Sequence, residues 1–151
     1  MIPAAFDYYS PTSVSEAVQL LQQHGDDAKI LAGGQSLIPA MRFRLATPGV
    51  LIDINKIADL AYVREDEGFL AIGALTRESD LERALEGNTR FGLLNDAVKV
   101  IADPLVRNLA TVGGNLAHAD PANDHPAVML AYGARLVAVG ANGQRTIPAD
   151  D

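Results

Sequence analysis

The sequence predicts an α+β fold built from two subdomains, a small α/β subdomain at residues 1–55 and a larger, incomplete α+β subdomain at residues 56–151. Over the first range, short apolar strand segments alternate with helical segments, and this order is typical of a small parallel sheet. After Lys56 the pattern changes to two hairpins separated by helices, which indicates antiparallel pairing. A length of 151 residues is enough for two such subdomains sharing a core.

The first subdomain is expected to contain three strands and one well-capped helix. Ser13 has the position of an N-cap, and Glu16, three residues later, completes a capping box before an apolar run. Strands are predicted at 6–10, 28–32 and 50–54, with a short helical or irregular segment at 35–45. Apolar residues in the capped helix recur at i, i+3, i+4 and i+7, so one face is buried: Val14, Ala17, Val18 and Leu21.

The second subdomain is predicted to hold two hairpins and three helices. Residues 102–123 carry few regular signals, and we expect a long loop there, which in a compact domain usually has a function or is disordered. The hairpins are expected at 61–72 and 134–147, and the helices at 76–85, 91–101 and 124–132, the last with Pro126 in its first turn.

The composition excludes several classes of protein. The formal net charge is −7, with 12 Lys and Arg against 19 Asp and Glu, so no nucleic-acid or anionic-membrane partner is expected. The chain has no cysteine, which excludes disulfides, thiolate nucleophiles and cysteine-ligated iron–sulfur clusters within it. No apolar run approaches the roughly 20 residues needed to span a bilayer, and the first residues do not resemble a signal peptide. We therefore expect a cytoplasmic protein with no membrane span.

Two stretches place a pair of glycines beside polar side chains: AGGQS at 32–36 and TVGGN at 111–115. Because glycine has no Cβ, such loops let another group approach the backbone and its N–H donors. A diphosphate needs several N–H donors at once, and two such loops facing each other would clamp one between the subdomains. Gln35 and Ser36 would add side-chain donors to the first loop.

The same loops also have a simpler interpretation. With 13 glycines in 151 residues, adjacent pairs arise by chance, and each pair can be an ordinary turn. Neither stretch matches G-x-G-x-x-G or the P-loop pattern. The pattern alone therefore leaves an anion-binding loop and a turn as alternatives.

Polar residues crowd the stretch HADPANDH: His118, Asp120, Asp124 and His125. Their spacing matches no zinc motif, so we predict a polar loop and no metal site, with a metal-dependent hydrolase as a third hypothesis. Asp124 has two compatible roles, a ligand contact and the N-cap of the following helix. No Ser–His–Asp or Cys–His set suggests a nucleophile, so no catalytic residue is assigned. Tyr8 and Tyr9 are expected in the small core.

A resemblance to one family runs through almost the whole chain, in order. It rests on PAAFDYYSPTSVSEAVQLL, ILAGGQSLIPAMRFRL, IGALT and VRNLATVGGNLAHADPANDHPAVMLAYGARL. These stretches are similar to the FAD-binding (medium) subunits of molybdenum hydroxylases, the carbon monoxide dehydrogenase and xanthine dehydrogenase type. The implied fold is the FAD-binding domain of the vanillyl-alcohol oxidase and UDP-N-acetylenolpyruvylglucosamine reductase type, with FAD between two α/β subdomains.

The resemblance also implies which residues contact the cofactor. In that family the AGGxS and TxGGN loops grip the FAD diphosphate, and an aspartate of the D-P-x-x-D stretch contacts cofactor hydroxyls. The implied FAD contacts in this chain are Ala32, Gly33, Gly34, Gln35, Ser36, Thr111, Val112, Gly113, Gly114, Asn115 and Asp124.

The function implied by the resemblance is that of an electron-transferring flavoprotein subunit. A molybdenum-cofactor large subunit would oxidise the substrate, and 2Fe–2S clusters of a small subunit would pass electrons to FAD here and on to a terminal acceptor. The expected assembly is a heterotrimer, or two heterotrimers together. A non-redox nucleotide-binding or interaction module on the same loops is the alternative. Family members are longer and this chain stops at PADD after a strand, so we expect a truncated form without the family's C-terminal domain.

Overall fold

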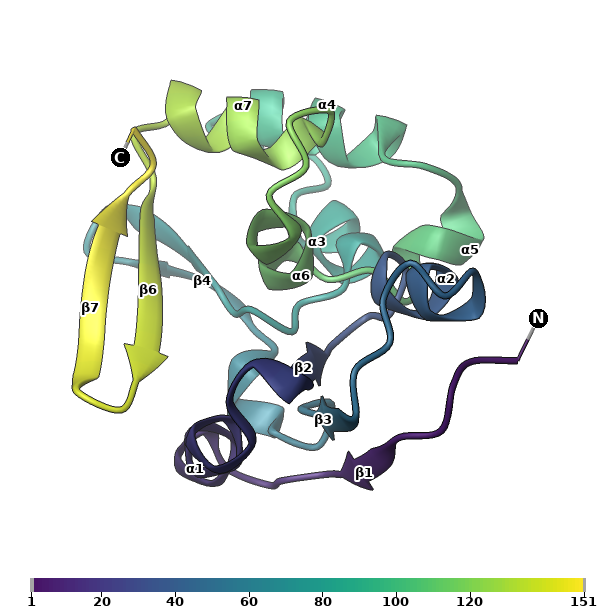
Figure 1. The fold of residues 1–151 in the computed structure, drawn as a ribbon. Helices are drawn as coiled ribbons and strands as arrows, with labels where there is room; N and C mark the ends of the chain where they lie inside the picture. Colours follow the sequence, from purple (N-terminus) through teal and green to yellow (C-terminus); the bar gives the residue numbers. More distant parts are fainter. Residues whose placement is uncertain (1, 151) are drawn as a thin grey trace.

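A three-stranded parallel sheet forms the lower part of the molecule in Figure 1, in the strand order β1-β3-β2. The structure, a computed structural model, describes residues 2–150. Both outer strands run in register with the central one, since Asp7 and Ala28 each pair with Val50. The predicted parallel sheet is confirmed, and the carboxyl ends of its strands meet at one edge. Strands β1, β2 and β3 span Asp7–Tyr9, Ala28–Leu31 and Val50–Asp53.

Helix α1 (Val14–His24) connects β1 to β2 and begins as the sequence predicts. The Ser13 hydroxyl accepts a hydrogen bond from the Glu16 amide at 3.2 Å, and Glu16 Oε2 accepts one from the Thr12 amide at 2.9 Å. The capping box is confirmed, although the carboxylate reaches one residue further back than the usual partner. One face of α1 packs on the sheet around a buried cluster of Ala17, Ala28, Val50, Ile52 and Ile57.

The connection from β2 to β3 contains a short helix, α2 (Leu37–Arg42), inside the segment predicted to be helical or irregular. Two 3-10 turns, η1 (Gly25–Asp27) and η2 (Ala58–Leu60), complete this lobe. Ile57 belongs to the cluster beneath the sheet, so the packing of the first lobe extends slightly beyond residue 55.

The second lobe packs helices above the sheet in Figure 1, around a separate buried cluster. It begins with a hairpin of β4 (Val63–Asp66) and β5 (Phe69–Ile72). None of the helices within residues 2–150 combines the length and apolar character that crossing a bilayer requires. The lobes have separate cores rather than a shared one. Helices α3, α4 and α7 span Glu78–Ala84, Gly92–Val100 and Asp124–Ala131. The cluster consists of Leu81, Leu85, Leu94, Val98, Val112 and Val128.

The prediction of a long loop over 102–123 is wrong, because two short helices form there: α5 (Pro104–Arg107) and α6 (Val112–His118). Asp103 caps α5, and its Oδ1 accepts hydrogen bonds from two amides of the first turn at 2.7 and 3.0 Å. Pro104 occupies the first helical position, where its missing N–H is not needed. Both signals were present in the sequence, in the dipeptide Asp-Pro.

Helix α6 was harder to predict, because the second glycine pair lies in its first turn. Glycine disfavours a helix interior by about 1 kcal/mol relative to alanine. The Thr111 hydroxyl offsets part of this cost by accepting a hydrogen bond from the Gly114 amide at 3.2 Å. The remaining support comes from the contacts of Gly113 with a distant segment of the chain, described below.

The chain ends in the predicted second hairpin, drawn at the left of Figure 1, between β6 (Arg135–Gly140) and β7 (Gly143–Pro148). Gly140 pairs with Gly143, so the connecting turn consists of Ala141 and Asn142. The predicted hairpin is confirmed, although it spans 135–148 rather than 134–147.

Candidate functional site

The two glycine loops, far apart in the sequence, meet where the two lobes touch. A Cβ atom on Gly33 would lie 2.8 Å from Ala110 Cα and closer still to the Leu109 carbonyl oxygen. A Cβ atom on Gly114 would lie 3.9 Å from the Ala32 Cβ. The backbone of the first loop therefore lies directly against the segment that leads into the second. The predicted meeting of the loops is confirmed.

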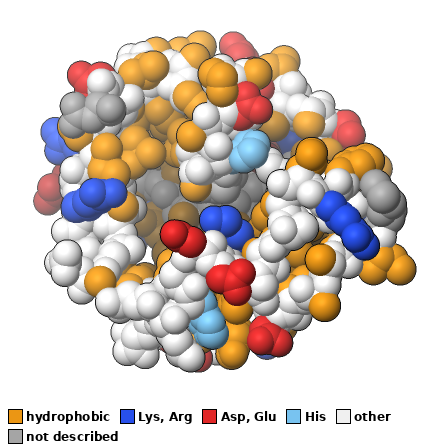
Figure 2. Space-filling view, in the orientation of Figure 1, with side chains coloured by type: hydrophobic (Ala, Val, Ile, Leu, Met, Phe, Trp, Pro, Cys, Tyr) orange, Lys and Arg blue, Asp and Glu red, His pale blue; other side chains and the backbone are white. Residues whose placement is uncertain are grey.

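One face of the molecule is hollowed (Figure 2). Figure 2 shows this face hollowed near its centre, in the region between the sheet and α6 of Figure 1. Hydrophobic side chains line part of the hollow, and charged side chains of both signs stand at its lower rim. A concave region at the junction of two lobes is a common place for a ligand.

The first loop carries backbone amides that the protein itself does not use. Within residues 2–150, the N–H groups of Gly33, Gly34, Gln35 and Ser36 donate to no protein acceptor. None of these residues is fully buried, so a ligand can reach them. Gly34 has φ +75°, a conformation that glycine adopts without strain. Successive amides in such a turn form a concave site for anion oxygens, because each free N–H can donate to one of them.

The second loop differs, because its amides already have acceptors. All the amides from Val112 to Asn115 donate within the protein, so the expectation of bare amides is wrong for this loop. Its glycines serve close packing instead, since a Cβ on Gly113 would lie 2.6 Å from the Ala74 Cβ. The acceptors, in chain order, are Thr76 O, Ala74 O, Thr111 Oγ1 and Thr111 O, at 3.0, 3.0, 3.2 and 2.9 Å.

A polar atom of the second loop nevertheless lacks a partner. Asn115 Oδ1 is buried and accepts no hydrogen bond within the described part of the chain. The Asn115 carbonyl oxygen accepts one from Asn123 Nδ2 at 3.0 Å, which ties this loop to the start of α7. Asn123 holds the N-cap position of α7, and the exposed Asp124 is its first residue. The N-cap role considered for Asp124 is therefore wrong, and its carboxylate is exposed to solvent.

A chain of hydrogen bonds that the sequence pattern did not predict connects the lobes beside the glycine loops. Arg77 donates to Asn55 Oδ1 at 2.6 Å and to the Leu109 carbonyl oxygen. Asn55 Nδ2 donates to the Ala32 carbonyl oxygen at 2.8 Å and to Asp53 Oδ1 at 2.6 Å. The available signal was position, since Asp53 is the last residue of β3 and Asn55 follows it, at the same sheet edge as the first loop.

Tyr8 extends this chain of hydrogen bonds. It was expected in the core, but its side chain is 54% exposed and donates to Asp53 Oδ2 at 2.6 Å. Partial burial of Asp53 removes water from its carboxylate, which raises the pKa. Hydrogen bonds from Tyr8 and Asn55 and the positive charge of Lys56 lower it by more, so the pKa of Asp53 lies below its usual 3.8. The same hydrogen bond to the carboxylate raises the pKa of Tyr8. Tyr9 packs on the small core as predicted.

Replacing Tyr8 by phenylalanine is expected to raise the pKa of Asp53, because the ionised carboxylate loses a donor. Because the pKa of Asp53 is lower in the folded protein than in the unfolded chain, its carboxylate stabilises the fold at pH values above the unfolded pKa. That stability is lost as the pH falls through the folded pKa. The stability difference between the two proteins should therefore shrink below about pH 4. An NMR titration of Asp53 measures the effect, and an unchanged pKa in the variant would contradict it.

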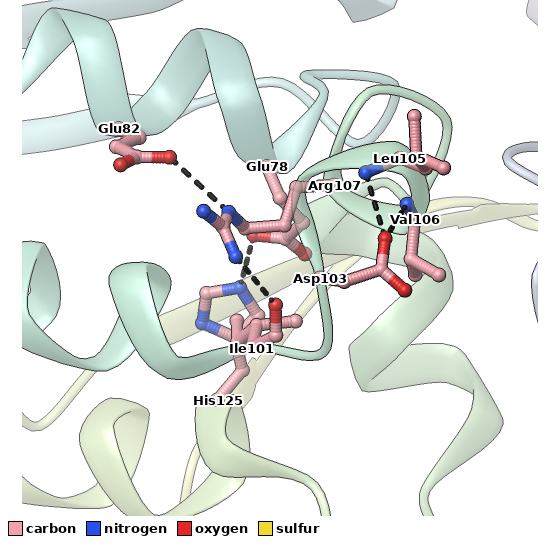
Figure 3. Close-up of polar contacts among 8 residues, drawn as sticks. All are labelled: Glu78, Glu82, Ile101, Asp103, Leu105, Val106, Arg107 and His125. Atoms are coloured by element: carbon pink, nitrogen blue, oxygen red, sulfur yellow. Dashed lines mark hydrogen bonds and ion pairs between the residues drawn. The ribbon is translucent and has the colours of Figure 1, made fainter.

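A hydrogen-bonded pair of titratable side chains lies in the core of the second lobe (Figure 3). His125 Nε2 lies 2.8 Å from Glu78 Oε2, and both side chains are 0% exposed. His125 was expected in a polar loop, and this is wrong because α7 carries it into the core, whereas His118 and Asp120 are exposed. Among residues 2–150, no group of three or more His, Cys, Asp or Glu side chains could hold a metal ion.

Arg107, also drawn in Figure 3, holds the segment before the second loop against two other helices. Its Nε donates to Glu82 Oε2 at 3.2 Å, and its Nη1 donates to the Ile101 carbonyl oxygen at 3.1 Å. These partners lie in α3 and at the end of α4. The guanidinium group therefore joins α5 to both helices and helps to fix the path of the chain toward TVGGN.

The sequence matches a known family over residues 4–151, described as the FAD binding domain in molybdopterin dehydrogenase. Because the match covers nearly the whole chain, this chain belongs to that family, and its cofactor is FAD. The resemblance stated from the sequence motifs is thereby confirmed, together with a mixed α/β FAD-binding fold.

The particular relatives are subunits of dehydrogenases. The carbon monoxide dehydrogenase medium chain of Hydrogenophaga pseudoflava is 53% identical, over 99% of this chain and 52% of its own length. The 6-hydroxypseudooxynicotine dehydrogenase complex subunit alpha of Paenarthrobacter nicotinovorans is 45% identical, over 98% and 50%. A solved structure of the Hydrogenophaga pseudoflava carbon monoxide dehydrogenase, 53% identical over 99% and 52%, superposes with a TM-score of 0.96. The chain therefore spans about half the length of the relatives it matches.

Proposed function

We propose that this chain is the flavin-carrying electron-transfer module of a molybdenum hydroxylase. The observation that carries the proposal is the set of unpaired amides at 33–36, which lies against the second glycine loop. Several free N–H donors suit a diphosphate, and FAD contains one. Membership of the FAD-binding family supports the same cofactor.

The residues proposed to hold FAD differ in what they offer. The first loop, 32–36, would donate amide N–H groups to the diphosphate. The second loop, 111–115, would form the opposite wall, with the unpaired Asn115 Oδ1 as an acceptor. Asp124 would accept hydrogen bonds from cofactor hydroxyls, because its carboxylate is exposed at the start of α7. FAD supplies the redox chemistry when bound, while the protein binds and orients it.

The proposed electron route needs groups that this chain does not contain. It has no cysteine, so 2Fe–2S clusters would be held by a partner chain. The relatives are named as a medium chain and as one subunit of a complex. We therefore include in the proposal a molybdenum-cofactor large subunit, a 2Fe–2S small subunit that delivers electrons, and a terminal acceptor that removes them. The assembly would be a heterotrimer, single or doubled.

A titration of the flavin-free protein with FAD tests the proposal. Flavin fluorescence and the visible absorption bands should change until each chain holds one FAD, and ADP should compete because it carries the same diphosphate. Elemental analysis should find no stoichiometric metal in the same sample. Binding of ADP without binding of FAD would favour the non-redox nucleotide-binding module instead. A folded protein that binds neither ligand would contradict both functions.

A further inference from the structure

We propose that Arg77 is a positioning residue that fixes the separation of the two glycine loops and adds positive charge beside them. This inference rests on the proposed function, because it concerns the site at which FAD would bind. Arg77 itself lies outside both glycine loops, immediately before α3. Its role would therefore be to hold the site in shape rather than to form it.

The guanidinium group of Arg77 joins segments of both lobes. Nη2 donates to Asn55 Oδ1 at 2.6 Å, and Nη1 donates to the Leu109 carbonyl oxygen. That oxygen is also the atom nearest to the position that a Cβ on Gly33 would take, so Arg77 and the first loop approach the same carbonyl group. Asn55 in turn donates to the Ala32 carbonyl oxygen at 2.8 Å. Arg77 is thus connected to the first loop and to the segment that enters the second.

The neighbours of Asn55 fix the orientation of its amide group. Nδ2 faces two acceptors, the Ala32 carbonyl oxygen and Asp53 Oδ1, so a flipped amide would place its oxygen against both. The Asn55 backbone N–H also donates to Asp53 Oδ1 at 2.9 Å, which holds the residue in place. Oδ1 is therefore the atom that faces Arg77, and donors and acceptors alternate correctly along the chain of hydrogen bonds.

The backbone of Arg77 is held beside the second loop as well. Arg77 forms an isolated antiparallel bridge with Thr111, the N-cap of α6. The next amide, that of Glu78, donates to the Ala110 carbonyl oxygen at 3.0 Å. Because the main chain fixes one end of the residue, only the side chain has to reach across to the first lobe.

The positive charge of Arg77 is not neutralised by a carboxylate. Its acceptors are an amide oxygen and a carbonyl oxygen, and within residues 2–150 it takes part in no ion pair. The side chain is half-buried, so water screens its charge only in part. A diphosphate at the amides of 33–36 would therefore bind beside a cation, which favours the anion. Lysine would keep the charge but lacks the planar fork that reaches two acceptors at once.

The test compares Arg77→Lys, Asn55→Ala and the double variant with a matched control, Arg83→Lys. Arg83 lies on α3, its side chain is 72% exposed, and it pairs with Asp80 on the same helix. The control therefore makes the same substitution in a nearby helix without touching either loop. Dissociation constants for FAD and for ADP are measured for each protein, below the melting temperature of the least stable variant.

Both dissociation constants are expected to rise about tenfold or more in each single variant, since each variant breaks a charge-assisted hydrogen bond. The double variant should bind no more weakly than the weaker single variant, because both changes remove the same connection. Arg83→Lys should bind like the parent. In the ligand-free protein, the NMR amide shifts of Gly33 and Gly34 should move in the single variants and stay in place in the control.

Parent-like FAD affinity in Arg77→Lys, or additive losses in the double variant, would overturn the positioning role. A loss of affinity for FAD without a loss for ADP would also overturn it, since the loops would then not act on the diphosphate. If the parent protein binds no FAD, the proposed function fails instead. The amide shifts of the ligand-free variants would still decide whether Arg77 positions the first loop.

Discussion

Replacing Gly33 by valine is expected to abolish FAD binding by this protein. A Cβ at this position would lie 2.8 Å from Ala110 Cα and would overlap the Leu109 carbonyl oxygen, and both atoms belong to the backbone. The first loop must then move away from the second, and its free amides lose their placement. Hydrogen bonds to charged groups contribute about 1.5–3 kcal/mol each, so losing two lowers the affinity at least about a hundredfold. Fluorescence titration with FAD measures the change.

Gly140→Val is the matched control for this prediction, because a Cβ on Gly140 meets no atom within 4 Å. It should bind FAD like the parent protein. If Gly33→Val does not fold, Gly34→Ala replaces it as the test of the first loop. A Cβ on Gly34 would meet only side-chain atoms. The φ of +75° would strain alanine by about 1–2 kcal/mol. Full FAD affinity in a folded Gly33→Val protein would exclude the first loop from the cofactor site.

The second large effect is expected for Glu78→Ala, which should lower the free energy of unfolding by about 3 kcal/mol. The substitution removes the carboxylate that His125 Nε2 contacts at 2.8 Å in a fully buried position. His125 Nδ1 already lacks a partner within the described residues, so the imidazole would lose its remaining hydrogen bond. A buried polar group without a partner is unfavourable because it has given up water without replacement. Urea denaturation followed by circular dichroism measures the loss.

A double replacement separates the polar contribution from packing. Glu78→Met combined with His125→Leu fills a similar volume with apolar atoms and leaves no polar group unpaired. It should regain most of the stability that Glu78→Ala loses. If the double variant is as unstable as the single one, the loss comes from packing. A loss below about 1 kcal/mol in Glu78→Ala would contradict the prediction itself.

Several parts of the fold that the sequence predicted well depend on residues close together in the chain. The cap of α1 joins Ser13 to Glu16, and the last hairpin turns through Ala141 and Asn142. Helix α6 was missed because its support comes from a distant segment. Its two glycines have a low helix propensity, and the acceptors at Thr76 and Ala74 become visible only in the fold.

The candidate site was predicted in part for the same reason. Glycine pairs indicated two loops, and the resemblance to a family supplied the expectation that they share a ligand. The pattern could not show that only the first loop keeps free amides, since this depends on which acceptors lie nearby. Nor could it show contacts between residues far apart in sequence. Arg77 and Asn55 are separated by 22 positions, and His125 and Glu78 by 47.

The two loops would contribute differently to ligand binding, because within residues 2–150 the amides of the second loop donate to protein acceptors and those at 33–36 do not. TVGGN has its shape set by the protein's own hydrogen bonds, so it can act as a rigid wall whether or not anything is bound. Of the two loops, only the stretch at 33–36 has amide N–H groups that donate to no acceptor among residues 2–150. Any ordering entropy lost on binding, about 1–2 kcal/mol for each residue that is fixed, therefore falls on one short stretch. A ligand would therefore order the loop at 33–36 against a second loop whose conformation is already set, instead of ordering both loops.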